Sequence, residues 1–230
     1  MINDKNSANG VTSFLNLILA IYTALRMKIE NKNSIIISLI SLYIVIEGYG
    51  RGSIIFVLIM IGINLIFIFY NLKIKMRMFC IFSLVTIIIF LIPYIYDVFK
   101  YTKIISGLDS PRFIILQEYL NKIDVFSLFF GASYENTIIA NEYNNNPHIA
   151  YIRGHHILGL IYLLGILYII LNKILYTILS RNLVNYIILL IVFNLLIRIM
   201  SEPLLFPSLF DSIFLVTLFL ISKTIKKESV

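Results

Sequence analysis

The chain has 230 residues, of which 60% are hydrophobic and only 13% are charged, and its mean hydropathy is +0.92. Because a soluble domain carries about a quarter charged residues, this composition excludes an ordinary soluble protein and predicts one embedded in a lipid bilayer. The formal net charge of +7 could indicate that the protein binds nucleic acid. The positions of the charged residues along the chain decide this question. The single cysteine, Cys80, excludes a disulfide within the chain and a cysteine-rich metal site.

Seven apolar runs are long enough to cross about 30 Å of hydrocarbon as helices rising 1.5 Å per residue. They lie near residues 9–26, 34–49, 53–72, 78–96, 155–171, 183–200 and 203–222. Many of their residues are β-branched, but a lipid-exposed segment must satisfy its own backbone hydrogen bonds, which favours helix. The sequence therefore predicts an all-α, polytopic membrane protein with about seven transmembrane helices, forming a single membrane domain over residues 1–230.

The loops between these runs fall into two alternating sets of opposite charge. One set contains only two acidic residues, Glu30 and Glu228, against the basic residues Arg26, Lys28, Lys32, Lys73, Lys75, Arg77, Lys173, Arg181, Lys223, Lys226 and Lys227. The other set holds most of the acidic residues, including Asp97, Asp109, Glu118, Asp124, Glu135, Glu142 and Glu202. The positive-inside rule places the basic set in the cytoplasm, the N-terminus outside and the C-terminus inside. The basic excess is thus a topology signal and does not indicate nucleic-acid binding.

The large loop over residues 97–154 is the one region outside the membrane, and the alternation places it on the outer face. Ser110 and Pro111 are typical of a helix start, as a capping hydroxyl followed by proline at the first helical position. Apolar residues then recur at helical spacing, at Phe113, Leu116, Leu120 and Ile123. We expect an amphipathic helix here, lying on the membrane or on the spans.

Three arginines are candidate ligands for an anion. Arg112, in the first turn of the loop helix, is either a snorkelling surface residue or shares an anion with exposed helix N–H groups. Arg51 lies between Gly50 and Gly52 in a tight outer turn. There it either pairs with a carboxylate or provides the positive charge of a compact anion-binding turn. Arg198, the only basic residue inside an apolar run, either pairs with Glu202 or contributes to the same anion site as Arg51 and Arg112. Arg153 is a further candidate.

All three histidines of the chain lie between residues 144 and 156. Their spacing lacks the i, i+4 geometry of a helical zinc site, and no carboxylate or thiol has ligand spacing, so we expect no metal. His155 and His156 start the fifth apolar run and are typical of polar interface residues. His148, in the loop, is the candidate general base. Outer cations beside an imidazole suit an anionic, phosphate-bearing amphiphile whose leaving phosphate the cations would stabilise.

Several segments resemble, in order, motifs of the bacterial O-antigen ligase and polysaccharide polymerase superfamily. GYGRGSIIFVLI, residues 48–59, resembles its small-residue, arginine, small-residue start of a span, and DSPRFIILQEYL, residues 109–120, its outer-loop arginine and aliphatic helix. LFFGAS, residues 128–133, resembles the glycine turn that follows. NPHIAYIRGHHILGLIYLLGILYII, residues 146–170, resembles the histidine motif running into a glycine-rich span, with Ile149 where the family usually has asparagine. DKNSANGVTSFL, residues 4–15, is similar to the entry of an earlier span.

The resemblance implies an all-helical membrane glycosyltransferase of the bacterial inner membrane, acting at the periplasmic face. Arg51 and Arg112 would hold the pyrophosphate of an undecaprenyl-linked glycan, and His148 would assist the acceptor hydroxyl. The reaction would be inverting and metal-independent, without a cofactor. Membrane lipid and a chain-length regulator protein would be its other partners. Members of the superfamily carry further spans before the first one here, which agrees with the outside N-terminus.

Four functions remain open on the sequence alone. A polymerase would join lipid-linked repeat units of O-antigen or capsular polysaccharide, and we expect this function first. A ligase would transfer the glycan to lipid A core or protein. A transporter of lipid-linked sugars would place paired charges at mid-membrane and use broken, repeat-related spans, whereas here the charges gather at one face. A non-catalytic subunit or an inactive fragment is the last alternative.

Overall fold

The computed structural model describes residues 8–48, 51–74, 76 and 111–222. Within these ranges the chain forms helices, turns and coil, with no strand. The elements are α1 (Ala8–Leu25), the π-helical turn η1 (Arg26–Glu30), α2 (Ile35–Glu47), α3 (Arg51–Asn71), α5 (Pro111–Asn121), α6 (Val125–Phe130), α7 (Ile138–Asn141), α8 (Ala150–Ser180), α9 (Leu183–Arg198) and α10 (Asp211–Phe219). The predicted all-α class is thus found throughout the described residues.

Three of the described segments are long and apolar enough to cross a membrane: Gly10–Glu30, Gly52–Asn71 and Ala150–Ser180. Two shorter apolar helices, Ile35–Glu47 and Leu183–Arg198, accompany them. This composition indicates a membrane protein. The predicted span at residues 78–96, and the residues of the predicted loop up to 110, lie outside the described residues.

The last predicted span, residues 203–222, is not one continuous helix. Turns and bends occupy residues 203–210, and α10 covers only Asp211–Phe219. Pro203 and Pro207 lack a backbone N–H group, so a helix could not run through them without losing hydrogen bonds. Asp211 instead holds the turn, since its carboxylate accepts the N–H groups of Phe206 at 2.9 Å and Ser208 at 3.0 Å.

The helix that contains the fifth predicted span, residues 155–171, is longer than the predicted span. Helix α8 begins at Ala150 and ends at Ser180, with a kink at Gly159, whose φ of 69° and ψ of −172° are not helical. Lys173, which the sequence placed in a loop after the apolar run, lies inside the helix, and its ammonium donates to the Ile221 carbonyl at 3.0 Å. Its charge therefore lies at the end of α10 rather than against lipid.

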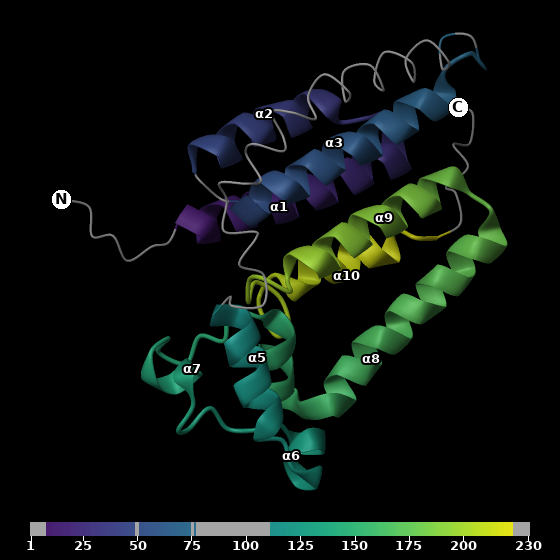
Figure 1. Ribbon diagram of the computed structural model, residues 1–230. Coiled ribbons are helices and arrows are strands. Elements are labelled where there is room, and N and C mark those ends of the chain that lie inside the picture. Colours follow the sequence, from purple (N-terminus) through teal and green to yellow (C-terminus); the bar gives the residue numbers. More distant parts are fainter. Residues whose placement is uncertain (1–7, 49–50, 75, 77–110, 223–230) are drawn as a thin grey trace.

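Helices α1, α3, α9 and α10 lie side by side as a bundle, with α2 against α3 (Figure 1). Buried polar side chains join them, as is common between helices in membranes. The Asn64 amide of α3 accepts the Ser34 N–H at 2.7 Å and donates to the Ser38 hydroxyl at 3.1 Å. Asn194 of α9 donates to the Phe56 carbonyl of α3 at 3.0 Å. Around these contacts packs one large apolar core.

A second, smaller lobe consists of α5, α6, α7 and the start of α8, gathered at one end of the bundle (Figure 1). Its core contains Ile115, Tyr119, Tyr134, Ile139 and Ile152. The helix expected from Pro111 is present, and its predicted apolar face packs only in part: Leu116 and Ile123 are partly buried against this core, and Phe113 and Leu120 are exposed. The fully buried residues of α5 are instead Ile115 and Tyr119. Apolar residues occur around most of α5, so spacing alone did not select the face that packs.

The two ends of the bundle differ in their charged groups. At the basic end, Lys28 bonds the Ser222 carbonyl at 2.7 Å and the Asn185 side chain at 3.1 Å, and Lys173 bonds the neighbouring Ile221 carbonyl. At the opposite end, which we call the site end, α9 finishes at Arg198 beside the first turns of α1 and α3. The lobe lies at this site end (Figure 1).

Candidate anion-binding site

One carboxylate joins two arginines at the site end. The Oε1 atom of Glu202 lies 3.8 Å from Nη2 of Arg198 and 4.0 Å from Nη2 of Arg112. The Arg112 side chain is 46% exposed, that of Glu202 15% and that of Arg198 6%. Two cations facing one carboxylate leave one excess positive charge. Its more accessible part is the guanidinium of Arg112.

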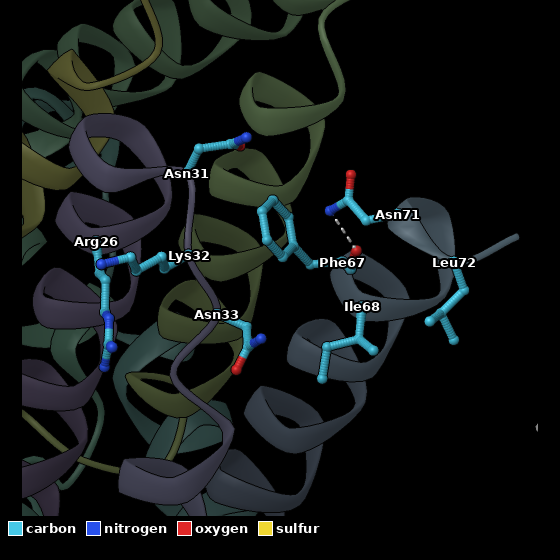
Figure 2. Close-up of a pocket in the computed structure, with 8 residues that line it drawn as sticks. All are labelled: Arg26, Asn31, Lys32, Asn33, Phe67, Ile68, Asn71 and Leu72. Atoms are coloured by element: carbon cyan, nitrogen blue, oxygen red, sulfur yellow. Dashed lines mark hydrogen bonds between the residues drawn. The ribbon is translucent and has the colours of Figure 1, made fainter.

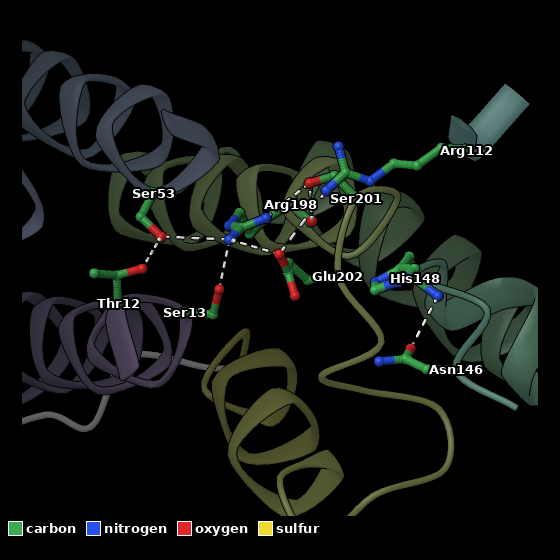
Figure 3. Close-up of polar contacts among 9 residues, drawn as sticks. All are labelled: Thr12, Ser13, Ser53, Arg112, Asn146, His148, Arg198, Ser201 and Glu202. Atoms are coloured by element: carbon green, nitrogen blue, oxygen red, sulfur yellow. Dashed lines mark hydrogen bonds and ion pairs between the residues drawn. The ribbon is translucent and has the colours of Figure 1, made fainter. Parts of the chain in front are cut away.

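Arg198 is fixed in place by hydroxyl groups from three elements. Its Nη1 donates to the Ser201 hydroxyl at 2.7 Å, and its Nη2 donates to the hydroxyls of Ser13 on α1 and Ser53 on α3. Figure 3 shows these α1 and α3 hydroxyls on one side of Arg198, with Glu202, Arg112 and His148 on the other. The Nε atom of Arg198 is buried and has no hydrogen-bond partner within the described residues.

The start of α3 makes room for this guanidinium. A Cβ atom added to Gly52 would lie 3.0 Å from Nη1 and 3.2 Å from Cζ of Arg198. Glycine at this position therefore permits the close approach of α3 to the buried cation. Arg51 is the first residue of α3, one position before this contact. Its side chain lies outside the described part of the structure, so its predicted contact with an anion stays a prediction.

His148 lies next to Arg112 and Glu202 in the segment that leads into α8 (Figure 3). Its backbone has a φ of 53°, its N–H donates to Asn146 Oδ1 at 3.0 Å, and its ring stands edge-on to Tyr143. Burial and the charge of Arg112 lower the pKa of His148 from 6.5, while Glu202 opposes this effect. The imidazole is therefore neutral at neutral pH and can accept a proton.

Hydrogen bonds between α8 and the α9–α10 connection bring these residues together. The Ala150 N–H donates to the Ile199 carbonyl at 3.1 Å, and the Tyr151 hydroxyl to the Leu196 carbonyl at 3.0 Å. The Arg153 guanidinium donates to the Pro203 carbonyl at 2.9 Å, directly after Glu202 in the chain. Arg153 thus supports the backbone of the site, and it does not join the Glu202 carboxylate with the other two arginines.

The other two histidines hold the lobe together. His155 is buried; its Nε2 donates to the Leu128 carbonyl at 2.9 Å, which leaves Nδ1 to accept from the Tyr119 hydroxyl at 2.9 Å. Burial raises the pKa of Tyr119 to about 12, so this hydroxyl keeps its proton. His156 donates from Nδ1 to the Ala132 carbonyl at 2.6 Å and stacks on Tyr134. Both therefore connect the start of α8 to the rest of the lobe.

Two clefts lie at opposite ends of the protein. A cleft of about 500 Å³ lies in the lobe and is lined by residues of the lobe and of α8, among them Tyr134, Glu135, Asn145, Arg153 and His156. A second, of about 430 Å³, lies between the η1–α2 connection and the end of α3 (Figure 2). In that cleft Arg26 and Lys32 both approach the Glu30 carboxylate, at 3.6 and 3.7 Å. Arg112, His148, Arg198 and Glu202 do not line the first cleft, and Arg153 connects that cleft to the site through its hydrogen bond to the Pro203 carbonyl.

The sequence did not reveal the hydroxyl groups around Arg198. Thr12, Ser13 and Asn16 are buried on α1, and the Ser53 hydroxyl donates to the Thr12 hydroxyl at 3.0 Å. Asn16 is fully buried, and both polar atoms of its amide lack a hydrogen-bond partner in the described residues. The available signal was the interruption of the first apolar run by these polar residues on one side of a helix.

Comparisons with protein-family models, with curated proteins and with solved structures find no match to this chain. Among the described residues, no group of three or more histidine, cysteine, aspartate or glutamate side chains is arranged to hold a metal ion. The groups that the site end brings together are two guanidinium groups, a shared carboxylate and a neutral imidazole.

Proposed function

We propose that this chain is a membrane glycosyltransferase that polymerises lipid-pyrophosphate-linked oligosaccharide repeat units at the outer face of the bacterial inner membrane. The observation that carries the proposal is the convergence of Arg112, Arg198 and His148 on Glu202 at the end of a membrane helix bundle. Arg112, His148 and the Arg198–Glu202 pair come from three segments distant in the sequence. The likeness of residues 48–59, 109–120 and 146–170 to the O-antigen ligase and polymerase superfamily supports the same reaction.

The two arginines suit a pyrophosphate at the membrane surface. Guanidinium groups bind phosphate oxygens in a planar, two-pronged geometry that lysine does not reproduce. Arg198 is held rigid by its hydroxyl partners, whereas Arg112 is half-exposed and free to approach a ligand from the lobe. In this account Glu202 keeps the two cations paired before the donor binds. The pyrophosphate then takes over part of that pairing, and Arg51 adds a third cation from the start of α3.

His148 would act as the general base of an inverting transfer. Its imidazole takes the proton from the acceptor hydroxyl as the hydroxyl oxygen attacks the anomeric carbon of the donor glycan. The bond from that carbon to the pyrophosphate oxygen breaks, and the arginines stabilise the negative charge left on the leaving group. One glycosidic bond forms, and the growing glycan moves from one lipid pyrophosphate to the terminal sugar of another lipid-linked repeat.

In this proposal the cleft of about 500 Å³ in the lobe holds the sugars. Its volume falls within the usual range for small-ligand sites. Glu135, Asn145, Arg153 and His156 offer donors and acceptors suited to sugar hydroxyls, and the opposite charges of Glu135 and Arg153 favour an uncharged ligand. Arg153 also touches the backbone beside Glu202, so a saccharide in the cleft would lie next to the arginines.

The direct test compares surface and lipid-linked glycans on gels from cells whose only copy of the gene is wild type, Arg112→Ala or Lys32→Ala, at equal protein levels in the membrane. Lys32, at the basic end, is the control because it is an exposed cation far from the proposed chemistry. We expect Arg112→Ala to reduce long chains to single repeat units, since removing one charge-stabilising group typically costs about 10²–10³-fold in turnover. Lys32→Ala should leave chain length unchanged.

The same gels separate the alternatives. Long chains that accumulate on the lipid carrier in Arg112→Ala cells would mean that the protein is a ligase. Glycans of normal length and location in these cells would contradict the proposed role of Arg112, and with it the glycosyltransferase proposal.

A further inference from the structure

Helix α6 presents an exposed apolar surface at the edge of the lobe. Val125 is 80% exposed, Phe126 71% and Phe130 63%, and the rings of Phe126 and Phe130 contact each other at 4.7 Å between centroids. Together with Phe129, these residues leave no polar side chain on α6 except Ser127, which belongs to the helix cap. So much exposed aromatic surface on six residues requires a partner other than water.

The short helix is built firmly enough to hold this surface in place. Asp124 accepts the Ser127 N–H at 2.7 Å, and the Ser127 hydroxyl accepts the Asp124 N–H at 2.8 Å, which forms a capping box. Two carbonyls of the α6 region, those of Leu128 and Ala132, accept hydrogen bonds from His155 and His156 of α8. The exposure of the phenylalanines is therefore not the result of a poorly fixed segment.

Two glycines allow α6 to lie directly against the kink of α8. A Cβ atom on Gly159 would lie 1.8 Å from the Phe129 carbonyl oxygen, and one on Gly131, whose φ is 97°, would lie 2.3 Å from the His156 carbonyl oxygen. No side chain fits at either position. The contact fixes α6 at the point where α8 changes direction.

Beyond that kink, α8 is long enough to cross a membrane by itself. Residues 160–180 cover about 31 Å at 1.5 Å per residue, close to the thickness of the hydrocarbon core. This part of α8 is largely exposed and apolar, as at Ile161, Leu164, Tyr168 and Leu171. If it spans the bilayer, its kinked end lies at the membrane surface. The phenylalanines of α6 then continue the lipid-facing surface of α8.

We propose that α6 is a membrane anchor, whose Phe126 and Phe130 side chains insert into the lipid interface next to Gly159. The anchor would keep the lobe, and with it Arg112 and His148, close to the bilayer. Lipid is favoured over a second copy of the chain because α6 packs against the kink of a span-length helix whose residues beyond that kink are largely apolar and exposed. This proposal does not depend on which reaction the site performs.

The test uses the full-length protein with Cys80→Ser, reconstituted in vesicles of phosphatidylethanolamine and phosphatidylglycerol and spin-labelled at one introduced cysteine. Phe126→Cys and Phe130→Cys are compared with Ile161→Cys on the exposed face of α8 and with Glu135→Cys on the polar side of the lobe. Collision rates with oxygen, which enriches in lipid, and with a water-soluble nickel chelate are measured. All four residues are on the surface or partly so, and unchanged thermal unfolding checks that each variant folds.

We expect labels at 126 and 130 to behave like the label at 161, with the ratio of oxygen to nickel collisions at least threefold above that at 135. A ratio equal to that at 135 would place α6 in water and overturn the proposal. Low collision rates with both reagents would overturn it too, since they would mean that another part of the chain or a second copy covers the helix.

Discussion

The two ends of the helix bundle place their cations in different chemical surroundings. At the basic end, Lys28 and Lys173 donate to backbone carbonyls at the end of α10. At the site end, Arg198 and Arg112 face a side-chain carboxylate and hydroxyl groups, beside a histidine whose pKa is lowered. Cations near helix carbonyls complete the hydrogen bonding of the helix end and complement its dipole. Cations around a partly exposed carboxylate can instead exchange that partner for another anion.

This difference separates structural charge from charge that a ligand can use. A backbone carbonyl at a helix end cannot be replaced by a ligand group without disturbing the helix end, so the two lysines serve the fold. Glu202 is a side chain on a turn between two helices, and Arg112 lies on a separate lobe. The site end therefore combines one buried cation with one half-exposed cation, which suits the capture of a phosphate group. The predictions that follow test this contrast.

The largest effect is expected for Arg198→Leu. Removing this buried guanidinium leaves Glu202 without its closest cation and the Ser13 and Ser53 hydroxyls without their donor. Breaking one partner of a buried ion pair typically costs about 3–5 kcal/mol, so thermal unfolding in detergent should shift strongly and long glycans should be lost. The double variant Arg198→Leu/Glu202→Leu should recover part of the stability. A double variant no more stable than Arg198→Leu would show that Glu202 is not the relevant partner.

The next effect is on turnover. His148→Asn keeps a residue that tolerates the left-handed backbone at this position but removes the base, so turnover should fall by about 10²–10⁴-fold while donor binding survives. Because the neutral imidazole is the active form and its pKa is lowered, wild-type activity should rise with pH through a midpoint below 6.5. The residual activity of His148→Asn should not rise with pH in that range. An unchanged pH profile in the variant would remove His148 from the reaction.

The smallest effect is expected at the basic end. Lys173→Met keeps the apolar stem of the side chain but loses the hydrogen bond to the Ile221 carbonyl. A loss of about 1 kcal/mol in unfolding free energy is expected, together with glycans of normal length. Shortened glycans in cells carrying Lys173→Met, at normal protein levels, would contradict the proposed difference between the two ends of the bundle.

The sequence was sufficient where hydropathy or local spacing decides the structure. It predicted the helical class and a helix following Ser110, and the pairing of Arg198 with Glu202 at i+4 was one of the two alternatives that it left open for Arg198. It failed where tertiary contacts choose among similar local options. The buried face of α5 is set by the hydrogen bond between Tyr119 and His155 and by the neighbouring side chains of the lobe, which spacing along α5 does not report.

The site itself was only partly predictable, for the same reason. Arg112 and His148 were recognisable as candidates because charged and titratable groups are rare near apolar runs. Their meeting at Glu202 depends on the hydrogen bonds that tie the start of α8 to the end of α9. The hydroxyls of Ser13 and Ser53 gave only a weak signal, since small polar residues are frequent between membrane helices.

The most direct test of the central claim is the binding of undecaprenyl pyrophosphate to the purified protein in nanodiscs, compared among wild type, Arg112→Ala and Lys32→Ala. Equilibrium titration with the radiolabelled lipid measures this affinity without requiring turnover. The account predicts that Arg112→Ala weakens binding at least tenfold and that Lys32→Ala binds as wild type does. Equal affinity for all three proteins would contradict it, because the exposed cation at Glu202 would then contribute nothing to holding the pyrophosphate.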